Sequence, residues 1–419
     1  MKIVLLSSVF GKHAIGGAER TVAAIGTSLH RRGHQVTMVS LGAPGQAAQR
    51  YTDANGLSVW HIPLAQLYDP FALAGKSGKT THHAASKALW HLLDVYNPIM
   101  ARRLRHVLQE LRPDVVSTHT LQGFSVAAWQ EARRAGAKLI HMTHDLSLIC
   151  PRTAMTRGPD VCTKVCGDCA VYGALRHGLA TMPDAIVGPS SSVLERHRQF
   201  GWFRQVARQQ VIPNSLADNW PPCPAQIPLG EPLTFGFLGR LDESKGVDTL
   251  LQALQHLPAG SCRLRIAGAG DVAGVKRRWL PSGWEAAVTF PGTVQAAQFM
   301  QEIDVLITPS RAQETFCNVV LEATSLGRPA IVADSGALPE RVEHGKSGWI
   351  IPAGSSQALA EAMRHCLENP QEVRQKGSYG ASMRSLYSAQ AQGDLFEALC
   401  LGLINGEPHN VGAEQSPHI

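Results

Sequence analysis

The sequence predicts an α/β protein with two domains, each built on a parallel β-sheet, that face each other across a cleft. Short apolar runs of strand length alternate with amphipathic stretches of helical length along the chain. This alternation is typical of parallel sheets covered by helices. A segment with four prolines near the middle of the 419 residues divides the alternation into two series. A chain of this length is expected to form two or three domains.

The first series contains seven apolar runs that we interpret as strands. They cover residues 3–6, 36–39, 57–62, 115–117, 139–142, 185–187 and 211–212. Amphipathic helices are predicted between them over residues 18–29, followed by the helix-ending Gly33, and over residues 99–111.

The prolines lie within residues 221–228, where they can continue neither a helix nor a central strand. The second series of apolar runs follows, over residues 233–238, 264–267, 287–290, 305–308, 330–332 and 349–351. We therefore predict a first domain over residues 1–220, a hinge over 221–232 and a second domain over 233–385. A helix over 386–405 is expected to pack back toward the first domain, before a flexible tail over 406–419. A ligand is expected in the cleft, at the carboxyl ends of the strands.

The composition is that of a globular protein, with 44% hydrophobic and 17% charged residues. It excludes a disordered, collagen-like or coiled-coil chain. The opening apolar stretch is too short for a signal peptide, and no apolar run approaches the ~18 residues that span a membrane. A cytoplasmic location is therefore expected. Residues 1–220 carry 24 Lys and Arg against 13 Asp and Glu, so this half has a net charge of +11 and suits an anionic partner.

Two carboxylates eight residues apart, Glu314 and Glu322, form the strongest chemical signal. They follow the strand predicted over 305–308, and Glu322 lies about one turn into a helix. The backbone amides near Asn318 and Val319 at the start of this helix suit a pyrophosphate, and a carboxylate below them suits ribose hydroxyls. Glu314 could accept hydrogen bonds from a sugar. The alternative is two glutamates that share no ligand.

Two cations and a glycine pair extend this signal. Arg240 and Lys245 lie on one loop after the strand predicted over 233–238, where they could neutralise a departing diphosphate. Gly16 and Gly17 come after the first strand and open a helix, so the backbone could approach a phosphate or a sugar closely. The alternatives are solvated loop cations and a plain turn.

With these residues in place, the chain resembles the retaining glycosyltransferases of family 4, which have the GT-B fold of two Rossmann-like domains. The resemblance spans nearly the whole chain. It rests on Gly16-Gly17-Ala18-Glu19, Pro113-Asp114-Val115-Val116, His119, Thr143-His144-Asp145, Ile212-Pro213-Asn214, Gly239-Arg240 with Lys245-Gly246, Gly268-Ala269-Gly270, and the Glu314–Glu322 pair.

The resemblance implies a role for each of these site residues. It assigns Arg240 and Lys245 to the donor diphosphate, Glu322 to the ribose, Glu314 to the transferred sugar and His144 to the active site between donor and acceptor. Thr315 and Cys317 stand where the family usually has Gly or Pro and Gly, and Ser215 stands where it usually has Gly. These departures leave the identity of the donor sugar open.

The predicted function is therefore retaining transfer of a sugar, as by a hexosyltransferase, from a nucleotide diphosphate sugar to a saccharide or lipid-linked acceptor. The resemblance to bacterial surface-polysaccharide enzymes places it in synthesis of exopolysaccharide, O-antigen or another cell-surface glycan. The sequence contains no Asp-x-Asp, so no metal or other cofactor is expected to be required for catalysis.

Four clustered cysteines come shortly after His144, namely Cys150, Cys162, Cys166 and Cys169. The C-x2-C pair with two further thiols nearby predicts a structural zinc site on the acceptor side. The alternatives are unligated thiols, an iron–sulfur cluster or a redox pair.

The helix predicted over 99–111 carries a stripe of leucines and valine, with Arg102, Arg103 and Arg105 on its remaining surface. This combination suits an anionic membrane, at the inner face of the cytoplasmic membrane, where a lipid-linked acceptor would be found. The alternative is an ordinary amphipathic helix that packs on the sheet of the first domain.

Three other classes of function remain as alternatives. A dinucleotide-dependent oxidoreductase is suggested by Gly268-Ala269-Gly270 after a strand, although the third glycine falls one place late for the fingerprint. A nucleic-acid-binding protein is disfavoured because the basic residues are dispersed and aromatic residues make up 6%. A catalytically silent sugar-nucleotide-binding protein is disfavoured because all of the expected site residues are present.

Overall fold

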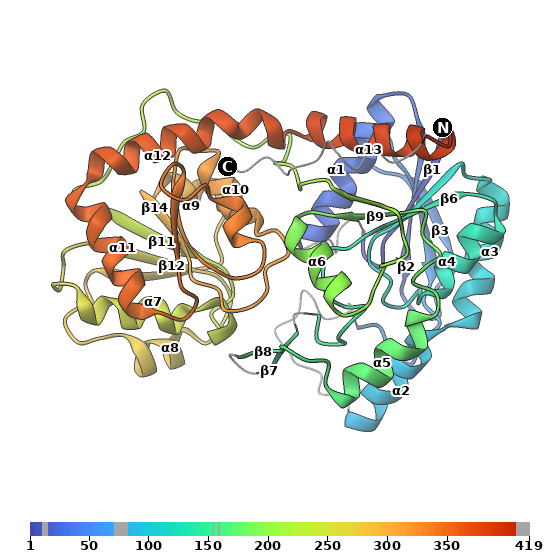
Figure 1. Cartoon of the computed structure of the whole chain (residues 1–419), viewed down its shortest axis with the longest axis horizontal. Coiled ribbons are helices and arrows are strands. Elements are labelled where there is room, and N and C mark those ends of the chain that lie inside the picture. Colours follow the sequence, from blue (N-terminus) through green and yellow to red (C-terminus); the bar gives the residue numbers. More distant parts are fainter. Residues whose placement is uncertain (11–15, 71–82, 154, 158–159, 408–419) are drawn as a thin grey trace. The chain divides into compact units, whose positions relative to one another are not determined.

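The computed structural model describes residues 1–10, 16–70, 83–153, 155–157 and 160–407, which form two compact units. Unit 1 consists of Met1–Thr153, Lys164–Ala217 and the segment that begins at Ala389. Unit 2 consists of Asp218–Ser388 together with a two-stranded ribbon, β7 (Thr156–Arg157) and β8 (Asp160–Val161). The sheets and helices of both units are drawn in Figure 1.

Unit 1 contains an eight-stranded sheet in the order β10-β9-β6-β5-β1-β2-β4-β3. The strands are β1 (Lys2–Leu6), β2 (Gln35–Gly42), β3 (Gln49–Thr52), β4 (Ser58–Pro63), β5 (Val115–Thr118), β6 (Lys138–Met142), β9 (Ala185–Gly188) and β10 (Arg208–Val211). All neighbours pair in parallel except β3 and β4, which are antiparallel. The chain changes direction across the sheet between β1 and β5, so the loops after these strands flank a crevice position.

Some helices of unit 1 begin at a side-chain cap or a glycine. The helices of this unit are α1 (Gly17–Arg31), α2 (Ala84–Val95), α3 (Pro98–Leu111), α4 (Ala127–Arg134), α5 (Gly167–His177), α6 (Ser191–Gln199) and α13 (Ala389–Ile404). The Asn97 side chain accepts a hydrogen bond from the amide of Met100 and so starts α3, and the hydroxyl of Ser190 does the same for α6.

Unit 2 contains a six-stranded, fully parallel sheet in the order β13-β12-β11-β14-β15-β16. Its strands are β11 (Thr234–Leu238), β12 (Arg263–Ala267), β13 (Val288–Gly292), β14 (Val305–Thr308), β15 (Ala330–Ala333) and β16 (Gly348–Ile351). Its helices are α7 (Val247–Ala253), α8 (Val272–Trp279), α9 (Ala296–Gln301), α10 (Asn318–Thr324), α11 (Ser356–Glu368) and α12 (Pro370–Ser382), with short 3₁₀ helices η2 (Glu243–Lys245), η3 (Leu254–His256), η4 (Leu338–Arg341) and η5 (Met383–Tyr387). The strand order reverses between β11 and β14, so the loops after these two strands flank a topological switch point.

The two parallel-sheet units confirm the predicted α/β class, because each predicted strand overlaps or adjoins an observed one. The sequence reasoning missed β3, β7 and β8. The four residues of β3 are all exposed, and β7 and β8 have two residues each, so none has an apolar run that would mark a strand.

Helix α13 packs beside α1 and completes the core of unit 1 (Figure 1). Its side chains Phe396, Leu399 and Cys400 join the cluster that contains Ile3 and Ile25. Ion pairs from Arg32 to Asp394 and Glu397 lie at the edge of this contact, at 2.6 and 2.9 Å. Helix α13 is therefore part of the core of unit 1.

Helix α3 packs within unit 1 through the apolar stripe that the sequence predicts. Leu104 and Leu108 are buried, and the helix contacts α4. Arg105 pairs with the buried carboxylate of Glu131 at 2.7 Å. The stripe of α3 is therefore occupied by the protein and does not face solvent. No helix of the described residues has the length and apolar character needed to cross a membrane.

Three histidines lie buried in unit 1, namely His119, His141 and His197, and His144 is partly buried. Burial lowers the pKa of each ring, to about 3 for His141 and to about 4 for His144 and His197. Each ring is therefore neutral in the folded protein near pH 7, whereas an exposed imidazole in the unfolded chain gains a proton below about pH 6.5.

This difference predicts that acid weakens unit 1 through His197, which lies in α6 and hydrogen-bonds the carbonyl of Val193. Because the folded pKa is about 4, the unfolded state takes up the proton as pH falls from 6.5 toward 4, and stability is lost over that range. Between pH 7 and pH 5 the wild-type protein should lose roughly 1–2 kcal/mol more unfolding free energy than His197→Gln. Urea denaturation at both pH values measures this, and an equal loss in both proteins would refute it.

Candidate functional site

An ion pair between Lys245 and Glu314 lies at the switch point of the unit 2 sheet. The ammonium of Lys245 is 2.6 Å from Oε1 of Glu314, and the hydroxyl of Ser310 donates to the same oxygen at 2.9 Å. Burial alone would lower the pKa of Lys245, but the Glu314 carboxylate outweighs burial and leaves this pKa raised. The lysine therefore stays charged beside a partly buried carboxylate, a state that suits binding of an anionic ligand.

Backbone contacts between the loops after β11 and β14 bring these two residues together across 69 positions of sequence. The amides of Arg311 and Ala312 both donate to the carbonyl of Ser244 at 2.9 Å. Gly246 has a φ of 76°, and a Cβ there would lie 2.1 Å from the carbonyl oxygen of Pro309. Only glycine allows this approach.

The loop after β12 packs against the loop after β11 through a second pair of backbone contacts. The amide of Gly239 donates to the carbonyl of Ala267, and the amide of Leu241 donates to the carbonyl of Ala269. A Cβ on Gly268 would lie 1.7 Å from the carbonyl oxygen of Gly239. The glycines of the Gly-Ala-Gly run therefore serve loop packing, which removes the observation that had favoured a dinucleotide fingerprint.

Arg240 lies on the same loop as Lys245 but faces solvent. Its side chain is 70% exposed, and its nearest carboxylate is that of Asp242 at 3.5 Å. Lys245 is held in place, whereas Arg240 can turn toward a ligand. The side chain of Asp242 also accepts from the amide of Lys245 at 3.1 Å, which fixes the turn of η2.

The backbone around Glu314 is fixed from behind by residues that the sequence reasoning missed. The amide of Ala337 donates to the carbonyl of Glu314 at 2.7 Å, and a Cβ on Gly336 would lie 2.4 Å from that oxygen. The buried guanidinium of Arg341 lies 4.4 Å from the ring centre of Phe316. Gly336 and Arg341 lie well beyond Glu322 in the sequence, so the spacing of the two glutamates could not have identified them. Ser310 lies four residues before Glu314, but serine alone gave no signal there.

Helix α10 begins at Asn318, directly after a strained residue. Cys317 has a φ of 68°, in the left-handed region that favours glycine, and its burial raises the pKa of the thiol to about 12. Glu322 is buried on this helix, and Val319 lies in its first turn. A position where the family usually has glycine therefore keeps a glycine-like backbone although it carries cysteine.

The glycine pair of unit 1 opens α1. Gly16 is the N-cap residue, with extended backbone, and Gly17 is the first helical residue. A Cβ on Gly16 would lie 2.4 Å from the carboxylate of Glu19. The Glu19 side chain therefore lies where a side chain at position 16 would be, and binding of a phosphate or sugar at this helix start stays a prediction.

His144 follows β6, and its ring lies against that of His119, which follows β5. Nδ1 of His119 is 2.9 Å from Nε2 of His144, and the ring centres are 5.2 Å apart. The amide of Thr143 donates to the carbonyl of Val187 and holds the end of β6. The sequence reasoning noted His119 only as part of the family resemblance and did not select it as a site residue.

The predicted zinc site finds no support. The sulfurs of Cys166 and Cys169 are 3.3 Å apart, and Cys150 also contacts Cys169, whose pKa is raised by burial and by these two thiols. Cys162 follows the β7–β8 ribbon, which is grouped with unit 2. Among the residues that the structure describes, no three or more His, Cys, Asp or Glu side chains are arranged to hold a metal ion. The structural zinc site therefore stays a prediction from the spacing of the cysteines.

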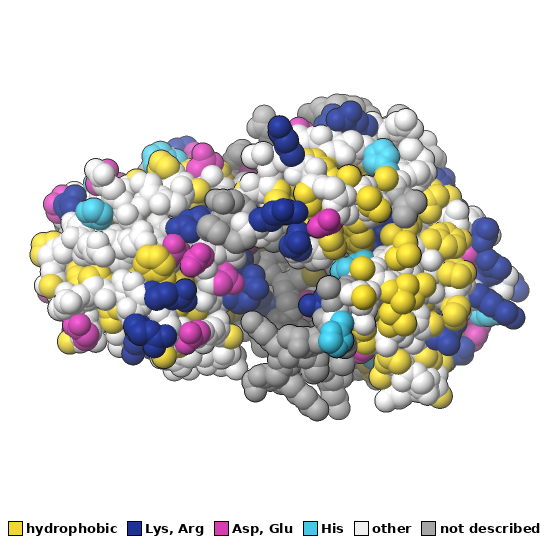
Figure 2. All heavy atoms as spheres, turned by 90° about the horizontal axis from the view of Figure 1, so that it is seen from below, with side chains coloured by type: hydrophobic (Ala, Val, Ile, Leu, Met, Phe, Trp, Pro, Cys, Tyr) yellow, Lys and Arg dark blue, Asp and Glu magenta, His cyan; other side chains and the backbone are white. Residues whose placement is uncertain are grey.

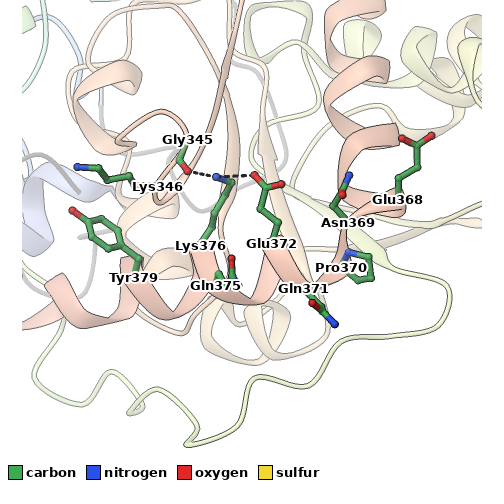
Figure 3. Close-up of a pocket in the computed structure, with 10 residues that line it drawn as sticks. All are labelled: Gly345, Lys346, Glu368, Asn369, Pro370, Gln371, Glu372, Gln375, Lys376 and Tyr379. Atoms are coloured by element: carbon green, nitrogen blue, oxygen red, sulfur yellow. Dashed lines mark hydrogen bonds and ion pairs between the residues drawn. The ribbon is translucent and has the colours of Figure 1, made fainter.

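A pocket of about 830 Å³ in unit 2 lies away from these residues, around the start of α12 (Figure 3). Its charged groups pair with one another, because Lys376 contacts both Glu372 and the carbonyl of Gly345. Lys346 and Tyr379 also line it, and each contacts Glu343. None of the predicted site residues lines this pocket, so volume does not identify the functional site.

Two family descriptions match the chain, one on each side of the proline-rich segment. Residues 16–215 match the glycosyl transferase 4-like domain, and residues 232–369 match glycosyl transferases group 1.

Relatives and solved structures of the same kind align with the chain. A 42.6 kDa protein in the cps region of Klebsiella pneumoniae is 28% identical over 81% of this chain and 87% of its own length. The amylovoran biosynthesis glycosyltransferase AmsK of Erwinia amylovora is 27% identical over 35% of this chain and 38% of its own. A sucrose-phosphate synthase from Thermosynechococcus elongatus superposes with a TM-score of 0.74 at 19% identity, over 97% of this chain and 99% of its own. Anabaena HepE in complex with UDP-glucose superposes with a TM-score of 0.67 at 18% identity, over 96% of this chain and 100% of its own.

Proposed function

Because the chain belongs to the group 1 glycosyltransferases of family 4, with the GT-B fold, we propose that it transfers a sugar from a nucleotide diphosphate sugar with retention of configuration. The observation that carries this proposal is the Lys245–Glu314 pair at the switch point of unit 2, with Arg240 exposed on the same loop. Two cations and a carboxylate at this position match the charge of a sugar diphosphate and the hydroxyls of its sugar.

In this mechanism unit 2 binds the donor. Arg240 and Lys245 neutralise the diphosphate, and the amides of Asn318 and Val319 assist them. Glu322 binds the ribose, and Glu314 binds the hydroxyls of the transferred sugar while it keeps Lys245 in position. No Asp-x-Asp occurs in the sequence, so we assign the charge of the departing diphosphate to the two cations and the amides without an essential metal.

The bond changes take place on one face of the sugar. The bond from the anomeric carbon to the phosphate oxygen breaks, and a bond to the acceptor oxygen forms on the same face. The departing phosphate oxygen takes the proton of the acceptor hydroxyl. Unit 1 supplies the acceptor side, where His144 offers a ring nitrogen, and Gly16 and Gly17 let the backbone of unit 1 approach the donor.

We propose a saccharide or lipid-linked acceptor in the synthesis of a cell-surface polysaccharide. The names of two relatives support this, since one lies in a cps region and the other acts in amylovoran biosynthesis. The basic first half of the chain suits an acceptor at an anionic membrane, at its cytoplasmic face.

Helix α2 offers a better membrane contact than α3. Leu89, Leu92 and Leu93 on α2 are exposed, with Leu92 at 57%, and Val171 on the contacting helix α5 is 67% exposed. Figure 2 shows hydrophobic side chains gathered on unit 1, in the view from below, where Figure 1 places α2 and α5. Lysine and arginine side chains lie around this patch, a combination that suits insertion into an anionic surface.

The anomeric configuration of the product provides the first test of the function. The anomeric configuration of the product, read from its NMR spectrum, should match that of the donor. Activity should persist when EDTA is added. An inverted product would end the assignment, and loss of turnover in EDTA that added magnesium or manganese restores would end its metal-independent form.

The donor residues provide the second test. Lys245→Ala should remove ~2–5 kcal/mol of transition-state stabilisation, because it also leaves the partly buried Glu314 unpaired. Arg240→Ala should reduce kcat/KM through loss of a diphosphate contact. Lys346→Ala removes an exposed lysine of the same unit and should turn over normally. If all three variants match the wild type, the donor site lies elsewhere.

Flotation with liposomes tests the membrane contact. The full chain should float with vesicles that contain anionic lipid, and binding should fall as salt rises. Changing Leu89, Leu92 and Leu93 to Ser should abolish flotation, whereas Leu386→Ser, an exposed leucine of unit 2, should not. No flotation of the wild type, or equal flotation of both variants, would remove this proposal.

A further inference from the structure

The carboxylate of Glu314 is held through one of its two oxygens. Oε1 lies 2.6 Å from the ammonium of Lys245, and the hydroxyl of Ser310 donates to the same oxygen at 2.9 Å. Among the residues that the structure describes, no hydrogen bond is formed to Oε2. Two donors on Oε1 restrict rotation of the carboxylate, and they leave Oε2 available to accept from a ligand hydroxyl.

The backbone between Ser310 and Glu314 is held on both sides. The amides of Arg311 and Ala312 donate to the loop after β11, and the hydroxyl of Ser335 lies 3.0 Å from the carbonyl oxygens of the same two residues. Because the backbone is fixed, the torsions of the Glu314 side chain are the freedom that remains. The donors on Oε1 act on these torsions.

The two donors on Oε1 differ in their exposure to a ligand. The side chain of Lys245 is 25% exposed, and an ammonium has three N–H donors for which a bound diphosphate competes with Glu314. Ser310 is 1% exposed, so a ligand cannot draw its hydroxyl away. When Lys245 turns toward a diphosphate, Ser310 is the donor that stays on Oε1.

We propose that Ser310 is a positioning residue that keeps the Glu314 carboxylate in place while Lys245 binds the diphosphate of the donor, so that Oε2 accepts from a hydroxyl of the transferred sugar. This proposal rests on the proposed glycosyl transfer and adds a residue that acts through Glu314. Because Ser310 is buried, it does not touch the ligand itself. It therefore affects recognition of the sugar and leaves recognition of the nucleoside diphosphate unchanged.

Crystal structures of full-length variants test the positioning role without any ligand. Lys245→Ala imitates a lysine that has left Glu314, and the carboxylate should keep its orientation there, with Oε1 within hydrogen-bond distance of Ser310. In Lys245→Ala with Ser310→Ala, the carboxylate should turn or occupy more than one orientation. A carboxylate that leaves Ser310 in the single variant, or that keeps its place in the double variant, would overturn the proposal.

Equilibrium binding tests whether Ser310 acts on the sugar. The donor is first identified by hydrolysis of UDP-, GDP- and ADP-sugars by the wild type. Ser310→Ala should then weaken binding of that donor roughly 5- to 30-fold, as expected for a lost hydrogen bond to a charged group. The dissociation constant of the corresponding nucleoside diphosphate, which has no sugar hydroxyl for Glu314, should change by less than about twofold.

Two further variants show whether the effect passes through Glu314. In the Glu314→Ala background, Ser310→Ala should change donor binding by less than about twofold, because the carboxylate that it positions is absent. The control is Ser347→Ala, which removes another fully buried hydroxyl of unit 2, one that accepts from the amide of Glu343 at 2.9 Å. This variant should bind the donor as the wild type does.

The outcomes separate this proposal from the proposed function. If Ser310→Ala weakens the donor and the nucleoside diphosphate equally, weakens the donor further in Glu314→Ala, or behaves like Ser347→Ala, the positioning role is refuted. If the wild type binds no nucleotide sugar, the proposed function fails, whereas the crystal structures of the Lys245→Ala variants still decide whether Ser310 holds Glu314.

Discussion

The backbone contact between the loops that follow β11 and β14 is the constraint on which the donor side depends. Lys245 and Glu314 are 69 residues apart in sequence, and they meet because the amides of Arg311 and Ala312 share the carbonyl of Ser244. A bond between backbones does not depend on side-chain rotamers, so the charged pair sits on a rigid base. The lysine then needs little reorganisation to bind an anion. A charge that is already in position stabilises the transition state more than a charge that must first reorient.

Much of the fold could be predicted because parallel strands bury both faces and therefore read as continuous apolar runs. The run at 305–308 coincides with β14, and those at 264–267 and 139–142 each fall one residue short of β12 and β6. The edge strand β3 could not be predicted in this way, since its residues Gln49–Thr52 are exposed and pair with β4 alone. Burial produces the pattern, so a strand without burial leaves no pattern.

Site residues that lie in the loops after strands could be predicted from the sequence. The residues that hold those site residues in place could not. Lys245, Glu314 and His144 lie in loops after β11, β14 and β6, as their motifs indicated. Gly336 and Ala337 support Glu314 through contacts that only the folded chain creates, and neither residue type is informative alone. The cysteines differ from both cases, because their spacing predicts a four-sulfur zinc site that the described residues do not support.

Helix α13 has a consequence for how the protein is made. The core around β1 and α1 includes Phe396, Leu399 and Cys400, which follow the whole of Asp218–Ser388 in the sequence. During synthesis, the sheet of unit 1 keeps an uncovered apolar surface until all of Asp218–Ser388 has been produced. Nascent chains that stop short of α13 should therefore be the species that chaperones retain, because the apolar surface that α13 covers is still exposed in them.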